Sequence, residues 1–279
     1  MLRKPAVAGS FYQGAPEPLR KQVQSFIIPV NVRRKAIGML SPHAGLIYSG
    51  SVAGAVYSSI SLPDTFVLIG PNHTGLGAPV SLMCEGGWET PLGTVSIDES
   101  LASTILAKSP RIREDSAAHL REHSLEVQLP FIQYFKDSCK IVPIQMLDIR
   151  LNTCLEVGRA IAEAIKTRYQ NSGVKEQEAS DLGVLIVASS DMSHYERAAV
   201  AKENDFKAID NILNLDPNGL YQTVKTYGIT MCGCGPAVVM LEAANQLGAT
   251  KAELIKYTNS GDVSGDYERV VGYAGIVIM

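Results

Sequence analysis

The sequence lacks the long apolar segments that membrane and exported proteins carry. No run approaches the roughly 20 apolar residues that a membrane helix needs, and the nearest candidate, Ile229–Leu241, is Gly-rich and is followed by Glu242. The first residues, MLRKPAVAGSFY, do not contain the apolar stretch of a signal peptide. We therefore expect a cytoplasmic protein that does not enter a membrane.

The sequence also lacks an excess of charge of either sign. It has 25 basic and 28 acidic side chains, which gives a formal net charge of −3. Such a balance creates no field that would attract the phosphates of nucleic acids. We therefore expect no nucleic acid among its partners.

Cysteine is scarce, and its number is odd. The chain contains five cysteines. Without an export signal, these are expected to be reduced thiols rather than disulfides. Cys84, Cys139 and Cys154 lie in strand-like or helix-like surroundings, where a cysteine usually serves as a small buried hydrophobic residue.

What the sequence does contain is a regular alternation of apolar strand-like runs and helix-like stretches. Of its 279 residues, 46% are hydrophobic and 19% are charged, which is enough apolar surface for one large core. The predicted strands are Ala36–Leu40, Thr65–Ile69, a hairpin over Trp88–Ile97, Lys140–Met146, Gly183–Ala188, Lys251–Tyr257 and Gly272–Ile278. The predicted helices are Gly50–Ile60, a helix capped by Asp98 and ending at Lys108, Ser124–Phe135, Asn152–Arg168, Ala199–Leu213, a shorter helix capped by Asp216, and Gly235–Leu247.

Such alternation predicts an α/β fold with a mainly parallel, mixed central sheet and helices on both faces. The hairpin and the last strands are expected to pair antiparallel. The polar stretch Gln170–Ser180 is short enough to be a surface loop, so we expect residues 1–279 to form one domain.

Three of the five histidines share one context. His43, His73 and His194 each follow the end of a predicted buried strand, in a segment of Pro, Gly, Ser or Asn. The carboxyl ends of parallel strands lie along one edge of the sheet, where α/β proteins bind their ligands. A single histidine in a loop is more often a surface residue than a ligand. The repeated context favours convergence of all three on one site.

The other polar residues of these segments leave alternatives open. His119 carries no such signal, whereas His123 opens a helical stretch and fits a site residue and a helix start equally well. Asp191, three residues before His194, is expected to orient that imidazole and raise its basicity, a role compatible with capping a helix.

The segment Cys232-Gly-Cys234-Gly-Pro is the second unusual feature. Its CxC spacing differs from the CxxC of redox and zinc motifs and is a weak signal alone. A thiol at a helix N-terminus has a lowered pKa, which suits a ligand or nucleophile. Two small buried residues in a tight turn fit the pattern equally well.

Taken together, the motifs resemble those of the Memo family. They run nearly from end to end: AGSFY (8–12), SPHAGLIYSG (41–50), GPNH (70–73), W-x-TPLG (88–93), EHSLEVQLPF (122–131), SSDMSHY (189–195), TMCGCGP (230–236) and GYAG (272–275). The resemblance implies a fold similar to that of the LigB-type class III extradiol dioxygenases, which are non-haem iron enzymes that open catechol rings with O₂.

The resemblance also implies a set of site residues. It places His43, His73 and Cys232 as metal ligands, and Asp191 and His194 in the same pocket, where His194 is the acid/base. His123 is a further pocket candidate. Fe(II) is the first expected metal, with Cu or Zn as alternatives. The dioxygenases use a carboxylate as third ligand, and a thiolate there shifts the preference toward softer metals. Cys234 is either a competing ligand or a redox partner of Cys232.

Two classes of function follow from the resemblance. The first is a metal-dependent oxidoreductase acting on a small aromatic molecule. The second is a non-catalytic binding protein that uses the same pocket for a peptide or protein, since animal relatives are associated with phosphotyrosine peptides. Microbial genomes often pair the family with a radical-SAM protein and an AMMECR-type protein, which are further candidate partners. Simple metal carriage or redox buffering remains a third possibility.

Overall fold

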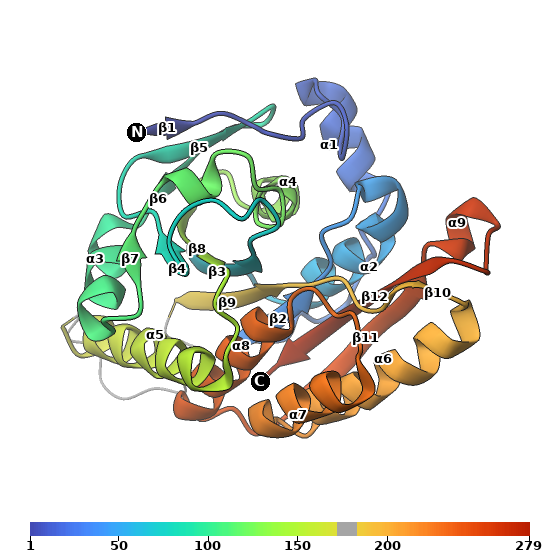
Figure 1. The fold of residues 1–279 in the computed structure, drawn as a ribbon. Coiled ribbons are helices and arrows are strands. Elements are labelled where there is room, and N and C mark those ends of the chain that lie inside the picture. Colours follow the sequence, from blue (N-terminus) through green and yellow to red (C-terminus); the bar gives the residue numbers. More distant parts are fainter. Residues whose placement is uncertain (172–182) are drawn as a thin grey trace.

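The computed structural model describes residues 1–171 and 183–279, and it shows one large sheet with helices on both faces (Figure 1). The strands are β1 (Leu2–Arg3), β2 (Gly38–Ser41), β3 (Thr65–Pro71), β4 (Val80–Leu82), β5 (Gly87–Thr90), β6 (Gly93–Ile97), β7 (Arg113–Glu114), β8 (Lys140–Met146), β9 (Val184–Ser189), β10 (His194–Glu196), β11 (Ala252–Asn259) and β12 (Val270–Ile278). The α-helices are α1 (Pro16–Gln24), α2 (Leu46–Ser59), α3 (Glu99–Lys108), α4 (Leu129–Phe135), α5 (Leu151–Asn171), α6 (Ala198–Leu213), α7 (Pro217–Tyr227), α8 (Cys234–Gln246) and α9 (Gly261–Ser264). Two 3₁₀ turns, η1 (Ala117–His119) and η2 (Glu126–Gln128), complete the described elements.

The centre of the sheet is parallel, as predicted. The strand order is β1-β5-β6-β8-β3-β9-β2-β12-β10, and the run from β6 to β2 is parallel at every step. The predicted antiparallel parts are also present, because β5 pairs with β6 as a hairpin and β12 pairs antiparallel with β2, β10 and β11. The expected α/β fold with a mixed, mainly parallel sheet is therefore confirmed.

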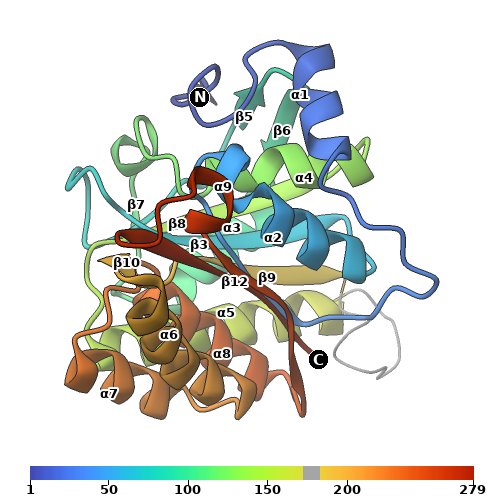
Figure 2. The same cartoon turned by 90° about the vertical axis from the view of Figure 1, so that its right-hand side faces the viewer.

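Two groups of helices cover the sheet (Figure 2). Helices α1, α2 and α4 lie on one face, where α2 packs against β2, β11 and β12. Helices α5, α6, α7 and α8 lie on the other face, with α8 against β2, β3 and β9. The central strands β2, β3 and β9 are buried along their whole length, which explains why their sequences are almost entirely apolar.

Two helices begin at side-chain caps that the sequence predicts. The carboxylate of Asp98 accepts a hydrogen bond from the backbone N–H of Leu101 at the start of α3, and that of Asp216 accepts one from Gly219 at the start of α7. Such caps satisfy N–H groups that have no partner within the helix. Both helices begin where predicted.

Other predicted boundaries are wrong or untested. Helix α2 begins at Leu46, earlier than Gly50, and the stretch predicted as one helix from Ser124 is the turn η2 followed by α4. Helix α1 and the short strand β4 are not predicted by the apolar pattern. The predicted loop Gln170–Ser180 falls almost wholly outside the described residues. No helix in the described part of the chain is both long and apolar enough to cross a membrane.

Candidate metal centre

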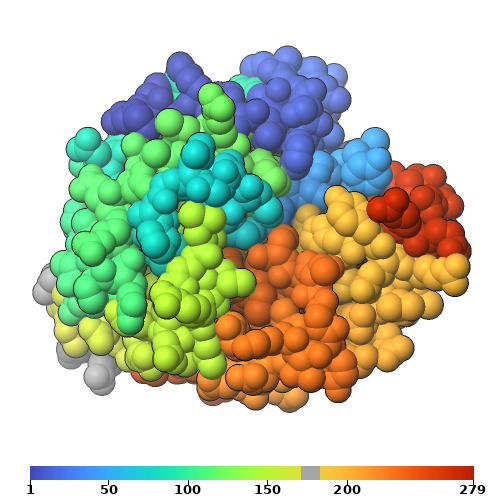
Figure 3. Space-filling view, viewed as in Figure 1, coloured from blue at the N-terminus to red at the C-terminus, as the bar shows by residue number. Residues whose placement is uncertain are grey.

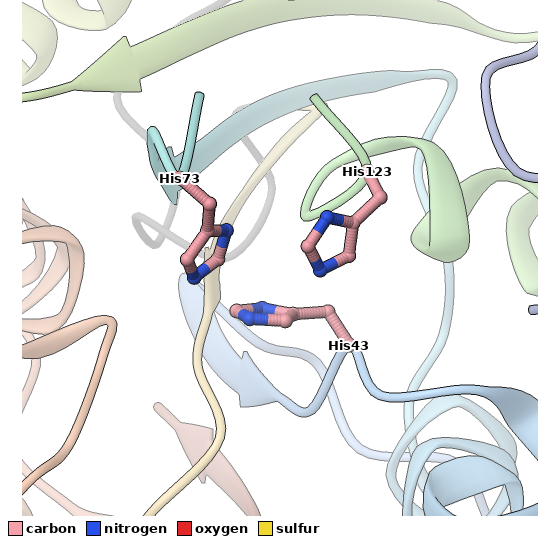
Figure 4. A group of neighbouring side chains, drawn as sticks. All are labelled: His43, His73 and His123. Carbon is pink, nitrogen blue, oxygen red and sulfur yellow. The ribbon is translucent and has the colours of Figure 1, made fainter. Parts of the chain in front are cut away.

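Three histidines converge at the carboxyl ends of the parallel strands. His43 follows β2, His73 follows β3, and His123 precedes η2. One ligand atom from each imidazole lies within 4.8 Å of the others, and Figure 4 shows the three rings gathered around one space. Of the three histidines expected to converge, His43 and His73 lie together, with ring centroids 5.3 Å apart, and His123 rather than His194 completes the compact group.

Glu122 is a buried residue of this site that the sequence does not predict. Its carboxylate accepts hydrogen bonds from the backbone N–H groups of His73, His123 and Ser124. One of its oxygens lies 3.0 Å from Nδ1 of His73 and 3.3 Å from Nδ1 of His123. Burial raises the pKa of Glu122, but these contacts outweigh it and hold the pKa at about 2. Glu122 is therefore ionised, and its only sequence signal is its position directly before His123.

The third imidazole, His43, is oriented by a hydroxyl. Its Nδ1 lies 2.9 Å from Oγ of Ser189. That hydroxyl donates its proton to the carbonyl of Ser124 and accepts from the amide of Gln128. The single proton of the Ser189 hydroxyl is used in the bond to Ser124, so Nδ1 of His43 must donate to Ser189. The lone pair of the neutral ring is then on Nε2.

Nδ1 of His43 and Nδ1 of His73 are hydrogen-bonded to Ser189 and Glu122, and Nδ1 of His123 lies 3.3 Å from the Glu122 carboxylate. Burial, together with the neighbouring His123 and His73, holds the pKa of His43 well below its usual range. Burial also lowers the pKa of His123. Neutral imidazoles whose second nitrogen donates to a carboxylate or hydroxyl are the form in which histidine binds metals.

The cysteine of the predicted ligand set lies beside this cluster. Sγ of Cys232 is 3.3 Å from Nε2 of His43 and accepts a hydrogen bond from the backbone N–H of Asp191. Among the residues that the structure describes, the compact three-donor group contains His123 and not Cys232. The assignment of Cys232 as a ligand stays a prediction.

The expected lowering of the Cys232 pKa by a helix N-terminus is wrong. Burial and the carboxylate of Asp191 raise the pKa of the thiol, because both disfavour a thiolate. The protonated thiol can instead donate to Nε2 of His43. Cys234 is buried at the first position of α8, and burial raises its pKa to about 12, in agreement with a small buried residue.

Asp191 does not hold His194, contrary to expectation. Its carboxylate accepts hydrogen bonds from the backbone N–H groups of His43, at 2.8 Å, and Ala44, at 3.3 Å. Nδ1 of His194 lies instead 2.9 Å from the carbonyl oxygen of Thr230. Asp191 thus fixes the backbone of a predicted ligand, while His194 lies in β10, outside the three-imidazole group.

His119, for which the sequence gives no site signal, lies apart from the cluster. It is buried against Trp88, with ring centroids 5.6 Å apart. Burial and the charge of Arg3 lower its pKa to about 3, so the ring is neutral and packs as part of the core.

The three imidazoles fit a transition-metal ion by chemistry and by spacing. Imidazole is a good ligand for Zn, Cu and Fe. A metal–nitrogen distance of about 2.1 Å places two ligand nitrogens at most about 4.2 Å apart. Donor atoms within 4.8 Å of one another need only a small closure to meet that limit.

The chain matches known proteins along nearly its whole length. The model of the Memo family, described as "Memo-like protein", matches residues 3–277. A MEMO1 family protein of Aquifex aeolicus is 45% identical over 100% of this chain and 99% of its own length. One from Methanothermobacter thermautotrophicus is 42% identical over 98% and 99% of the two chains, respectively.

A solved structure supports the fold. The crystal structure of uncharacterized protein JW3007 from Escherichia coli K12 matches with a TM-score of 0.56, at 13% identity, over 86% of this chain and 98% of that one. At this identity the likeness concerns the fold alone. The sequence matches carry the family assignment: the chain belongs to the Memo family.

Proposed function

We propose that the chain binds a transition-metal ion through Nε2 of His43, His73 and His123, with Cys232 as an additional donor. The observation that carries this proposal is that Nδ1 of His43 and Nδ1 of His73 have hydrogen-bond partners, Ser189 and Glu122, while Nδ1 of His123 lies 3.3 Å from the same Glu122 carboxylate. Burial lowers the pKa of His43 and of His123, which favours the neutral imidazole that binds metals. Fe(II) is the proposed ion, and Cu and Zn are the alternatives.

We further propose that the site is that of a metal-dependent oxidoreductase of the dioxygenase type, acting on a small aromatic molecule. A redox-active ion would supply the electron transfer to O₂ that such chemistry needs. Nε2 of His194 is the proton acceptor for a substrate hydroxyl, because its other nitrogen donates to Thr230. Asp191 contributes by fixing the backbone of the His43 segment.

Metal analysis of single variants tests the ligand set. His43→Ala and His73→Ala should each remove most of the bound metal from protein purified without air. His123→Ala should lose metal in the same way, and Cys232→Ser tests the additional donor: metal binding equal to that of the parent would show that the thiol is not a ligand. His119→Phe is the matched control. It removes an imidazole that lies outside the cluster and replaces it with another aromatic ring. Retention of metal by both His43→Ala and His73→Ala would exclude the site.

A peptide-binding function is the second candidate, and one observation favours it. Exposed apolar side chains flank the site histidines along the chain: Ile47 and Tyr48 after His43, Leu76 after His73, Leu120 before His123, and Tyr195 after His194. Figure 3 shows that segments far apart in sequence, coloured cyan, yellow-green and orange, adjoin on one face of the molecule. Exposed apolar side chains next to site residues in the chain are candidates for contact with a partner.

One assay separates the two functions. Metal-loaded protein is mixed with catechols and other small phenols, first without O₂ to detect binding and then with O₂ to detect consumption. Uptake of O₂ that is lost in His194→Ala, by the ~10²–10⁴-fold typical of acid/base groups, supports the enzyme. Peptide binding without O₂ uptake supports the alternative.

A further inference from the structure

His194 is held at two points by a single residue, Thr230. The backbone N–H of His194 donates to the hydroxyl Oγ1 of Thr230 at 2.7 Å. Nδ1 of the ring lies 2.9 Å from the backbone carbonyl oxygen of the same residue. A carbonyl oxygen can only accept a hydrogen bond, so Nδ1 carries the proton. In the neutral ring, the lone pair is therefore on Nε2.

The preceding part of the loop is fixed independently. Met192 donates its N–H to the carbonyl of Gly272, and Gly272 donates its own to the carbonyl of Ser193. Ser193 in turn donates to the carboxylate of Asp205, at 2.8 Å, which is buried and also accepts from the hydroxyl of Tyr257. A Cβ at position 272 would lie 2.0 Å from Asp205, so the close approach requires glycine there. These contacts hold the loop up to Ser193. His194 itself pairs with Val271 of β12 in the sheet, and Thr230 adds hydrogen bonds to its backbone N–H and to its ring.

The residue after His194 has a strained backbone. Tyr195 has a φ of 63°, a left-handed conformation that is unfavourable for a side chain other than glycine. Such strain persists only where the surrounding contacts determine the backbone. On the side of His194, the backbone is held by the hydroxyl of Thr230 together with the pairing of β10 with β12.

We infer that Thr230 is a positioning residue that fixes His194 in the tautomer with the proton on Nδ1, leaving Nε2 as the proton acceptor. In the alternative tautomer, the lone pair of Nδ1 would face the lone pairs of the carbonyl oxygen, and the hydrogen bond would be lost. Within the part of the chain that the structure describes, no residue hydrogen-bonds to Nε2, so that nitrogen is free for a substrate hydroxyl. The use of Nε2 in catalysis rests on the proposed function, but the tautomer does not.

The hydroxyl and the carbonyl of Thr230 act together. Oγ1 holds the backbone of His194, and this places the ring so that Nδ1 meets the carbonyl. Replacement by valine removes the hydroxyl and keeps the shape of the side chain. Thr230 is exposed, so this change should not disturb the core. Serine keeps the hydroxyl and should restore the arrangement.

The experiment reads the tautomer directly by NMR. Metal-free protein labelled with ¹⁵N in its histidine rings is studied by long-range ¹H–¹⁵N correlation, at a pH where the imidazoles are neutral. Signals of His194 are assigned as those missing from His194→Gln. The expected result is a protonated Nδ1 and an unprotonated Nε2 in the parent and in Thr230→Ser, and averaged nitrogen shifts from mixed tautomers in Thr230→Val. Thr226→Val, an exposed threonine of α7, should match the parent.

Two results would overturn the inference: a protonated Nε2 in the parent, or an unmixed Nδ1–H tautomer in Thr230→Val. A failure of the proposed function gives a different set of results. The parent then shows the Nδ1–H tautomer and Thr230→Val loses it, as the inference expects, but no phenol supports O₂ uptake. If O₂ uptake is found, Thr230→Val should lower it by about 10-fold or more at unchanged metal content, and Thr230→Ser should recover it.

Discussion

One carboxylate oxygen of Glu122 lies 3.0 Å from Nδ1 of His73 and also faces Nδ1 of His123, at 3.3 Å. A single buried anion thereby orients two of the three clustered imidazoles. Partners of this kind raise the basicity of metal-binding histidines, and their loss typically weakens metal affinity by about 10–100-fold. We predict a loss of that size for Zn²⁺ in Glu122→Gln, measured by calorimetry.

The reason for this loss is that the glutamine side chain is neutral and cannot accept at both of its terminal atoms. Glu85→Gln, which changes an exposed carboxylate, should bind Zn²⁺ like the parent. Equal affinity of Glu122→Gln and the parent would show that Glu122 does not support the metal site.

Two adjacent basic residues at the N-terminus should contribute very differently to stability. Arg3 is 1% exposed, lies over the ring of Trp88, and donates to the carboxylate of Glu126 at 2.6 Å. Removing one partner of a buried ion pair leaves the other charge uncompensated, at a cost of about 3–5 kcal/mol. We predict this loss for Arg3→Met in urea unfolding.

The matched control is Lys4→Met. Lys4 also pairs with a carboxylate at 2.6 Å, that of Glu89, but its side chain is 73% exposed. Exposed pairs contribute about 0–1 kcal/mol. If Arg3→Met and Lys4→Met lowered the free energy of unfolding by similar amounts, burial of the Arg3–Glu126 pair would not increase its contribution to stability.

Much of the fold is predictable because the strands of its sheet are buried on both faces. Runs such as Thr65–Ile69 have no polar alternation, and their ends are marked by Gly, Pro or Asn. Parallel pairing then places the ends of β2, β3 and β9 at one edge. Helix α1 is not predictable in this way, because only Leu19 and Val23 are buried and the rest of its surface is polar.

The site is predictable only to the extent that strand ends locate it. His43 and His73 follow the strands directly, so topology alone brings them together. His123 comes from the segment before η2, whose path over the sheet no local pattern encodes. The partner of His194 could not be predicted either, because the carbonyl of Thr230 is a backbone group 36 residues away. The nearby carboxylate of Asp191 is the more obvious candidate in sequence, but it bonds to the backbone of His43.

The strain at Tyr195 predicts that a substitution to glycine costs little stability, although it removes an aromatic side chain. A left-handed backbone costs an ordinary residue about 1–2 kcal/mol, and glycine does not pay this penalty. The change also removes a contact between the Tyr195 ring and Arg269, at 5.7 Å, which at an exposed site is worth about 0.5–1 kcal/mol. Glycine also costs about 0.5–1 kcal/mol because it has more freedom in the unfolded chain. We therefore expect the free energy of unfolding of Tyr195→Gly to lie within about 1 kcal/mol of that of the parent in urea unfolding.

Tyr227→Gly provides the comparison. Tyr227 is also exposed, but it ends helix α7, where glycine is unfavourable by about 0.5–1 kcal/mol relative to alanine. Tyr227→Gly relieves no backbone strain, so it should lower the free energy of unfolding more than Tyr195→Gly does. Equal losses in the two variants would show that the left-handed backbone at Tyr195 is not a source of strain.

The cap of α3 should make the stability of the protein depend on pH. Asp98 accepts from the N–H of Leu101 and from the guanidinium of Arg168, at 3.1 and 2.5 Å. Burial raises its pKa, but the hydrogen bonds to Arg168 and Leu101 outweigh it, so the folded-state pKa lies below the ordinary 3.8. The unfolded chain therefore binds this proton more readily. The stabilisation by Asp98 is present above about pH 4 and is lost as the pH falls through the folded-state value.

Two variants separate the charge of Asp98 from its role as a cap. Asp98→Asn keeps an oxygen acceptor for Leu101 but loses the ion pair, whereas Asp98→Ala loses both, including the roughly 1 kcal/mol of a typical cap. The free energy of unfolding is measured in urea from about pH 7 to about pH 3. The difference between the parent and Asp98→Asn should become smaller as the pH falls, because the Asp98 carboxylate of the parent is then protonated and loses its charge. The gap between Asp98→Asn and Asp98→Ala should stay constant, since neither variant has a group there that titrates. Asp137→Asn, at an exposed position, should follow the parent throughout. A gap between the parent and Asp98→Asn that does not change with pH would show that the ionised carboxylate is not what stabilises this end of the helix.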